Sequence, residues 1–190
     1  MKAAIKQEQN DARISSAERE QARPKVIVYH GGTQRIEHPL VHLGRAGLDF
    51  GQGFYLTDIR QQAEDWADRM SRIRLEPAVV NVYELDMERV KQAFAYHHFE
   101  KYDEEWLRFI VDNRTGAYSG PQYDVVEGGV ANDRVIDTVE AYMADLMPLE
   151  MALKYLSQHQ PNNQLCIRLQ KVIDECLVFT NSYQVKAYVE

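Results

Sequence analysis

The 190-residue chain has few of the residues that mark disulfide frameworks, zinc sites or membrane spans. It holds two cysteines, Cys166 and Cys176, with no CxxC pair and no histidine at metal-ligand spacing, so we expect two reduced thiols in the core. No stretch approaches the ~20 apolar residues that a transmembrane helix needs. The N-terminus lacks the apolar segment of a signal peptide. Together these absences predict a cytoplasmic protein with no membrane contact and no metal centre.

Clustered positive charge is also missing. The formal net charge is −7, and no run of Lys and Arg is long enough to follow a phosphate backbone. This argues against a non-specific nucleic-acid binder, although an enzyme that contacts RNA or DNA briefly remains compatible with it. With 45% hydrophobic residues the chain can bury one sizeable core, and its length predicts one domain.

The chain divides into a leader and a folded part. Residues 1–23 are polar, and too little apolar surface is present there to offset the entropy of ordering. This composition predicts a disordered leader or a solvated helix that docks on a partner. We expect residues 24–190 to form the folded domain.

Hydrophobic periodicity in the folded part predicts strands and helices without regular βαβ spacing, which is typical of an α+β fold. A helix over 59–73 is expected to begin at a capping box of Asp58 and Gln61 and to carry Trp66 on its apolar face. We expect strands over 25–29, 53–57, 79–85, 123–126, 164–169, 176–181 and 184–189, and further helices over 87–95, 104–111, 135–145 and 149–157.

Two short glycine-containing motifs carry the strongest chemical signal. Tyr29-His30-Gly31-Gly32 ends an apolar strand, and Gly51-Gln52-Gly53-Phe54-Tyr55 delivers a tyrosine onto a second strand. The glycines leave backbone N–H and C=O groups uncovered by a Cβ, the histidine supplies one directed hydrogen bond, and the tyrosine supplies a stacking face. These features predict a cleft for a flat ring that carries a carboxamide.

The same residues resemble the ADP-ribosyltransferase superfamily, in its His–Tyr–(Glu/Gln) branch. Trp66 stands eleven residues after Tyr55, where poly-ADP-ribose-polymerase-type sites carry a second ring-stacking aromatic. Over residues 26–180 the chain is still more similar to a bacterial family of ADP-ribosyltransferase-like proteins of uncharacterised function, whose members often sit beside a small partner protein in a toxin–antitoxin arrangement. That resemblance rests on Asp49-Phe50-Gly51-x-Gly53-Phe54-Tyr55, Tyr123-Asp124, Val130-Ala131-Asn132-Asp133 and Asn163-Gln164.

The resemblance implies a fold in which two small antiparallel sheets form a cleft for NAD and helices pack around them. It implies that Gly31 clamps the nicotinamide carboxamide through its backbone, that His30 binds a ribose hydroxyl, and that Tyr55 and Trp66 enclose the nicotinamide ring. Gln164 would hold the ribose 2-hydroxyl as an oxocarbenium-like centre develops. The implied catalytic residues are His30, Tyr55 and Gln164, and the implied NAD-binding residues are His30, Gly31, Gly53, Tyr55, Trp66, Asp124 and Asn132.

Gln164 departs from the pattern, because many members of the superfamily carry glutamate there. Glutamine accepts a hydrogen bond but has no charge and is no base. Polymer elongation is therefore not expected, and a single transfer of ADP-ribose fits better. If the reaction needs a carboxylate, the candidates are Asp124, Asp133 and Glu175.

We therefore expect a mono-ADP-ribosyltransferase that transfers ADP-ribose from NAD to a macromolecule, either a protein or a nucleic acid, as the toxin of a toxin–antitoxin pair. One alternative is an NAD glycohydrolase, in which water is the acceptor. Another is NAD-dependent removal of a 2′-phosphate from RNA, which needs a basic pocket that the sequence of this acidic chain does not predict. A third is a non-catalytic module that binds NAD or ADP-ribose and acts through partners, which Gln164 favours.

Several of these positions also have a structural explanation. His30 could be a turn or core histidine, Trp66 could pack in the core, and Gln164 could lie on a surface strand edge. Asp124, Asn132 and Asp133 could cap the helix near Val135. Arg45 and Arg114 could bind the NAD pyrophosphate or could form surface ion pairs.

Overall fold

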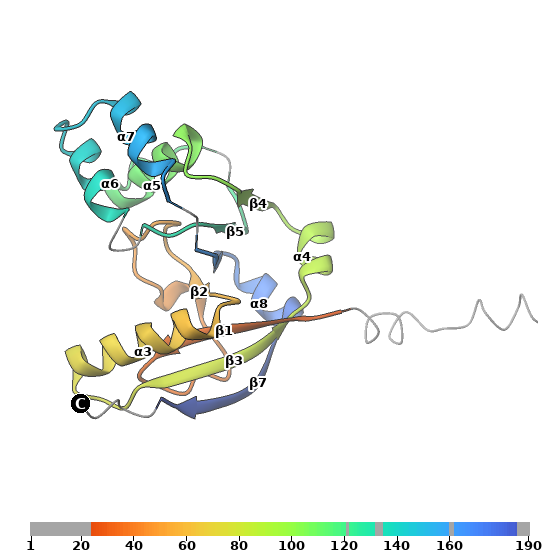
Figure 1. Cartoon of the computed structure of the whole chain (residues 1–190). Helices are drawn as coiled ribbons and strands as arrows, with labels where there is room; N and C mark the ends of the chain where they lie inside the picture. Colours follow the sequence, from red (N-terminus) through yellow and green to blue (C-terminus); the bar gives the residue numbers. More distant parts are fainter. Residues whose placement is uncertain (1–23, 121, 132–134, 160–161, 186–190) are drawn as a thin grey trace, which may run out of the picture.

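Two small sheets, each built from distant parts of the chain, form the framework of this α+β protein (Figure 1). The computed structural model describes residues 24–120, 122–131, 135–159 and 162–185. The first sheet has the order β1 (Val26–Gly32), β3 (Val79–Leu85) and β7 (Leu177–Gln184), and the second has the order β2 (Phe54–Leu56), β6 (Gln164–Ile167), β5 (Val125–Gly128) and β4 (Tyr96–Phe99).

The expectation of two antiparallel sheets is correct for the first sheet and wrong for the second. Strands β4 and β5 pair in parallel, whereas β5–β6 and β2–β6 are antiparallel. A parallel pair needs a crossover connection, and helix α5 (Glu104–Thr115) lies in the connection between β4 and β5. Strand β4 itself was not among the strands expected from the sequence.

The helices lie in separate groups. Helix α3 (Arg60–Arg74) runs along the first sheet against β1 and β3, whereas α5, α6 (Ile136–Met143) and α7 (Leu149–Leu156) gather over the second sheet (Figure 1). The remaining ones are α4 (Met87–Ala93), α8 (Gln170–Cys176) and a short 3-10 helix (Val41–Leu43). Among the described residues, no helix combines the length and the apolar character that crossing a bilayer would require.

The start of α3 differs from the expected capping box. Ile59 occupies the N-cap position without a side-chain cap, and Thr57 Oγ1 accepts a hydrogen bond from the Ile59 N–H at 3.1 Å. Asp58 therefore does not cap the helix. A threonine at the end of the preceding strand satisfies an N–H group instead, and it is itself buried.

The buried face of α3 is made of small residues. Ala63 and Ala67 are buried, whereas Trp66 is 44% exposed. Helix and strand approach so closely that a Cβ on Gly31 would lie 2.0 Å from the Ala63 carbonyl oxygen. Of the expected apolar face of Ile59, Ala63, Trp66 and Met70, Ala63 is buried and Met70 half-buried, whereas Ile59 and Trp66 are exposed. The buried face is instead Ala63 and Ala67, because contact with a glycine favours alanine on the helix.

Two hydrophobic clusters fill the interior. One joins the first sheet to the inner face of the second and to α8, and it includes Val28, Tyr83 and Cys176. The other packs α5, α6 and α7 on the outer face of the second sheet, and it includes Trp106 and Cys166. Both cysteines are free and buried, as expected, and burial raises their pKa to about 12 for Cys166 and about 11 for Cys176.

The C-terminal part was expected to hold two strands after residue 175. The structure has helix α8 followed by one strand, β7, which pairs with the whole length of β3 through an irregularity between Val82 and Tyr83. The proposed leader, residues 1–23, lies outside the described residues.

Candidate functional site

The candidate site begins where the two sheets meet. The Tyr29 N–H donates to the Thr57 carbonyl at 2.7 Å, and the Thr57 N–H donates back to the Tyr29 carbonyl at 3.0 Å. Within the described residues, this isolated bridge is the only pairing between β1 and the segment that contains β2. After this bridge the pairing stops, so the hydrogen-bond ladder between β1 and β2 is open at Gly31, which is itself buried.

The backbone of Gly31 faces this opening. Both hydrogen-bonding groups of Tyr29 point toward β2, and residues of an antiparallel strand alternate in the side to which these groups point. Gly31, two residues on, therefore directs its N–H and C=O to the β2 side as well, away from its register partner Val80 on β3. No β2 residue pairs with it there.

His30 follows Tyr29, the last β1 residue that pairs with the segment containing β2. Its Nδ1 lies 2.8 Å from the Tyr55 carbonyl oxygen, and its ring stacks on Phe54 with centroids 4.5 Å apart. A carbonyl only accepts, so Nδ1 carries the proton and Nε2 is an acceptor. Desolvation by burial lowers the pKa of His30, which favours this neutral form near pH 7. Nε2 lies next to Gly32, where a Cβ would be 3.5 Å away.

The hydroxyl of Tyr55 is used within the fold. It donates to the Gly51 carbonyl at 2.6 Å and accepts from the Phe50 N–H at 3.1 Å. Burial is the main cause that raises the pKa of this phenol far above its ordinary value. The hydroxyl therefore holds the turn before β2, and the half-buried ring is the part that remains for a ligand.

The turn that precedes β2 is built from buried and tightly packed residues. Asp49 pairs with Arg114 at 2.6 Å and accepts from the Ala131 N–H at 3.0 Å, so it ties the turn to the loop that follows β5. Phe50 is fully buried. A Cβ on Gly53 would lie 2.4 Å from Cys166 Sγ. Packing thus accounts for Gly53, whose contact with NAD stays a prediction.

Gln164 opens strand β6 opposite Gly128 of β5. Side chains alternate along a strand, so Gln164 lies on the same face as Cys166, which packs in the cluster that Tyr55 borders. Gln164 is half-buried, and among the described residues its amide has no hydrogen-bond partner. Its side chain lies on the face that carries Tyr55, and its contact with the ribose stays a prediction.

A polar network beside Gln164 was not singled out from the sequence. The carboxylate of Glu127 accepts hydrogen bonds from Asn163 Nδ2 at 3.0 Å and from the Tyr96 hydroxyl. The Asn163 carbonyl accepts from Thr57 Oγ1 at 2.8 Å. These contacts fix the start of β6 against β5 and β2. The only local signal was the Asn163-Gln164 pair, since the partners are distant in sequence.

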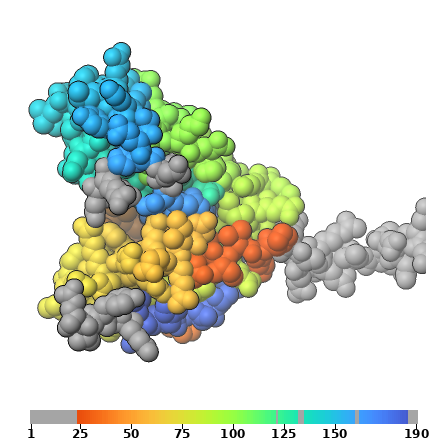
Figure 2. All heavy atoms as spheres, in the orientation of Figure 1, coloured from red at the N-terminus to blue at the C-terminus, as the bar shows by residue number. Residues whose placement is uncertain are grey.

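Trp66 is 44% exposed on α3, so of the two explanations considered for it, core packing is wrong and stacking on a ligand stays a prediction. Its ring contacts the guanidinium of Arg69, with Cζ 5.7 Å from the ring centroid. Figure 2 shows α3 (yellow) and the α6–α7 layer (blue) on the same face of the molecule. An exposed indole on α3 can stack on a ligand.

The other predicted residues divide into those tied elsewhere and those outside the described part. Asp124 Oδ2 accepts from the Ala95 N–H, at the end of β5 away from Gln164. Glu175 pairs with Arg89 and Lys171. Asn132 and Asp133 lie outside the described residues, and α6 begins at Val135 without a side-chain cap.

The two arginines proposed for the pyrophosphate differ from each other. Arg114 forms the half-buried ion pair with Asp49, so it holds the fold together and is not aimed at a ligand. Arg45 is exposed. The described residues contain no group of three or more side chains that could hold a metal ion.

Comparison with known proteins links the chain to one family. The sequence profile of a family described as "Protein of unknown function (DUF3990)" matches residues 26–179, which contain all the helices named above and every strand except the last part of β7. Searches of curated proteins and of solved structures returned no match.

Proposed function

This chain belongs to the DUF3990 family, and we propose that it is an NAD-dependent mono-ADP-ribosyltransferase with an ADP-ribosyltransferase-like fold. The observation that carries the proposal is the opening of the ladder between β1 and β2. It leaves the backbone donor and acceptor of Gly31 without a partner on β2, next to the neutral imidazole of His30, and we propose that NAD binds there. A carboxamide needs one donor and one acceptor, and a ribose hydroxyl can donate to Nε2.

The proposed positions divide the work of binding. The Gly31 N–H donates to the carboxamide oxygen and its C=O accepts from the carboxamide NH₂. Trp66, on α3, supplies a stacking face for the nicotinamide ring, with Tyr55 as the second face. His30 Nε2 accepts from a ribose hydroxyl, and its bond to the Tyr55 carbonyl fixes the ring.

The reaction proposed is cleavage of one glycosidic bond and formation of another. The bond between ribose C1 and the nicotinamide nitrogen breaks, and nicotinamide leaves with the bonding electrons as a neutral molecule. The nucleophilic atom of the acceptor then bonds to C1 and loses its proton. The Gln164 amide accepts a hydrogen bond from the ribose 2-hydroxyl, which orients the sugar while positive charge develops.

A non-catalytic NAD- or ADP-ribose-binding module is the second candidate, and a specific observation favours it. Gln164 has no charge, and the carboxylates of Glu127, Asp124 and Glu175 are each engaged elsewhere. Catalysis would therefore depend on an acceptor that is already a good nucleophile. Binding alone makes no such demand.

The test is release of nicotinamide from NAD by the purified protein, with and without cell lysate and with NAD labelled in the adenylate. The variants are His30→Asn, whose amide can still donate to the Tyr55 carbonyl but lacks Nε2, and Gln164→Ala. Gln184→Ala, at an exposed position of β7, is the matched control. All four proteins are compared at equal folded concentration.

Release that rises with lysate, labels a macromolecule, and falls at least about tenfold in His30→Asn and Gln164→Ala supports the transferase; tenfold corresponds to ~1.4 kcal/mol. Release that ignores lysate identifies an NAD glycohydrolase. NAD binding without release under any condition contradicts the enzyme and leaves the binding module.

The macromolecular acceptor and the antitoxin-like partner are part of the same proposal. If the protein is a toxin, cells that express it should grow slowly, and His30→Asn should restore growth at an equal level of folded protein. Equal growth with wild type and variant would contradict the toxin role.

A further inference from the structure

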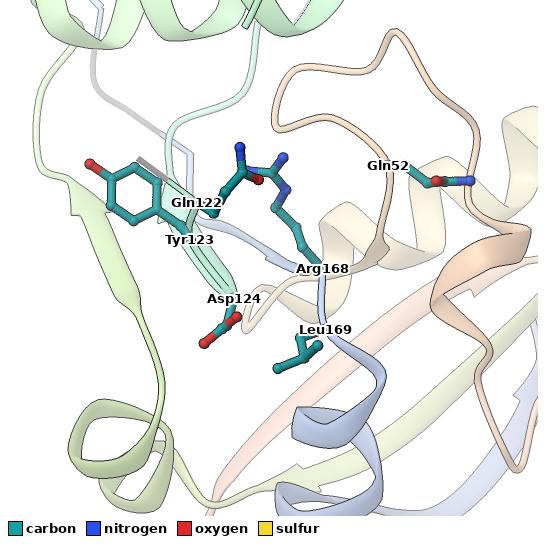
Figure 3. Close-up of a pocket in the computed structure, with 6 residues that line it drawn as sticks. All are labelled: Gln52, Gln122, Tyr123, Asp124, Arg168 and Leu169. Atoms are coloured by element: carbon teal, nitrogen blue, oxygen red, sulfur yellow. The ribbon is translucent and has the colours of Figure 1, made fainter. Parts of the chain in front are cut away.

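A second polar site lies at the other end of β6 from Gln164. A cavity of about 320 Å³ opens between the residues before β5, the end of β6 and the turn before β2, and its size is at the low end for small-molecule sites. Its lining residues are Gln52, Gln122, Tyr123, Asp124, Arg168 and Leu169, and Figure 3 shows the long side chain of Arg168 extending into the space between them.

Arg168 forms no ion pair with a carboxylate in the described part of the chain. Its Nη1 is shielded from solvent and has no hydrogen-bond partner there. The nearest aromatic contact is Tyr118, whose ring centroid lies 5.9 Å from Cζ. Leaving a buried donor unsatisfied is costly, and more so for a charged group, so an acceptor near this guanidinium would stabilise it. Because Nη1 itself is covered, a ligand in the cavity would reach the guanidinium through its other N–H groups.

The carboxylate in the cavity wall does not supply that acceptor. Asp124 Oδ2 accepts from the Ala95 N–H at 2.9 Å, and Figure 3 shows the carboxylate turned away from the guanidinium. The Asp124 backbone carbonyl accepts from the Arg168 N–H at 2.8 Å, which fixes where the arginine begins. The backbone thus positions Arg168 without neutralising it.

The other walls suit an organic molecule that carries the anion. Tyr123 stacks on His97 with centroids 4.5 Å apart and an angle of 14°, so its ring is held in place. Leu169 adds an apolar side chain. Figure 3 shows the Gln122 amide extending into the same space as the guanidinium, where it can donate a second hydrogen bond.

We propose that this cavity binds a phosphate group of a small organic molecule, with Arg168 as the principal ligand. A guanidinium binds phosphate through two parallel N–H groups, and a doubly charged phosphate matches an uncompensated cation better than a carboxylate does. The site is separate from the NAD cleft and does not depend on the function proposed above.

The test measures the thermal unfolding midpoint while inorganic phosphate, adenosine 5′-monophosphate or acetate is added, with sodium chloride at equal ionic strength as the reference. The variants are Arg168→Gln and the exposed control Arg45→Gln. His30→Asn is added so that the two sites can be told apart. A ligand that binds only the folded state raises the midpoint in a saturable way.

The expected result is a saturable rise with both phosphates in wild type, Arg45→Gln and His30→Asn, and no rise in Arg168→Gln. Without phosphate, Arg168→Gln should unfold no lower than wild type, because the unsatisfied nitrogen is gone. If the nucleotide reaches half-saturation at a concentration at least about tenfold lower than inorganic phosphate does, the ligand is an organic phosphate. If both reach half-saturation at the same concentration, the ligand is the free anion.

Two results would overturn the proposal. One is the same response in wild type and Arg168→Gln, which would be a general salt effect. The other is no response to either phosphate in wild type; if Arg168→Gln then also unfolds at a lower midpoint without phosphate, the arginine is structural.

Discussion

The two glycine-containing motifs that dominate the sequence serve different purposes in the structure. The segment 49–53 is fully used by packing and internal bonds: Asp49 joins Arg114 and Ala131, and Gly53 lies against Cys166. The segment 29–32 is hydrogen-bonded to Thr57 through the backbone of Tyr29. The backbone N–H and C=O of Gly31, which follow, have no pairing partner on β2. A motif shared with a family can therefore mark the framework of a site as well as the site.

This difference separates stability from function along the chain. Substitutions in the turn before β2 should unfold the protein, whereas substitutions at His30 and Gly32 should alter ligand binding in a protein that remains folded. Gly31 belongs to both groups, because α3 packs on its Cα while its backbone groups face the cleft.

The largest effect is expected for Asp49→Ala. It leaves the half-buried guanidinium of Arg114 and the Ala131 N–H without their acceptor, and breaking such a pair costs about 3 kcal/mol. The free energy of unfolding from urea titration measures it. Glu37→Ala, which breaks the exposed pair with Arg35, is the control and should cost less than about 1 kcal/mol. Equal losses would refute the structural role of Asp49.

The next effect compares two glycines. Gly53→Ala should lose about 2 kcal/mol, because the new Cβ would lie 2.4 Å from Cys166 Sγ and 2.7 Å from the Ile167 carbonyl oxygen. Gly32→Ala should be neutral or slightly stabilising, because its nearest neighbour is His30 Nε2 at 3.5 Å. Urea unfolding of both variants checks the difference. Comparable losses would show that segment 29–32 is as tightly packed as segment 49–53.

Thr57→Val should have a smaller effect. It removes the donor to the Asn163 carbonyl and the acceptor for the Ile59 N–H at a buried position, for a loss of about 1 kcal/mol. The exposed Thr115, which donates to the Val111 carbonyl, provides the control Thr115→Val with a smaller loss. Thermal and urea unfolding measure both. No difference between the two would argue against a structural role for the Thr57 hydroxyl.

The smallest expected effect is a pH dependence. Burial lowers the pKa of His30, so the unfolded state binds more protons than the folded state once the pH falls below about 6.5. The contribution of His30 to the free energy of unfolding is therefore complete above about pH 6.5. It decreases as the pH falls toward the lower pKa that His30 has in the folded state. The free energy of unfolding should fall less between pH 7.5 and pH 5.5 for His30→Asn than for wild type. Equal falls would mean that His30 is not buried in its neutral form.

Local patterns in the sequence predict a good part of the fold. Strand β3 has the predicted bounds, and β1 and β2 lie where the two motifs place them, because alternation of apolar residues and glycine steps act over a few residues. The parallel strand β4 was missed because its pairing depends on a crossover through α5. Capping by Thr57 instead of Asp58 likewise depends on the position of β2 against β1.

The site was predictable to a similar extent. His30, Gly31 and Gln164 are singled out by short motifs, whereas the exposure of Trp66 depends on how closely α3 approaches Gly31. The bonds among Tyr96, Glu127 and Asn163 join three strand ends and have no local signature. Arg168 had no signal at all, since its unbalanced charge arises from the direction in which Asp124 points.

Titration of NAD followed by tryptophan fluorescence tests the central claim most directly. Trp66 is 44% exposed and Trp106 is fully buried, so quenching by a stacked nicotinamide would come from Trp66. We predict saturable quenching by NAD, little by ADP-ribose, and at least about tenfold weaker binding in Gly32→Ala, whose methyl would lie in van der Waals contact with His30 Nε2 and take space that the ribose hydroxyl needs. No saturable quenching, or equal affinity in wild type and Gly32→Ala, would contradict a nicotinamide site at the opening between β1 and β2.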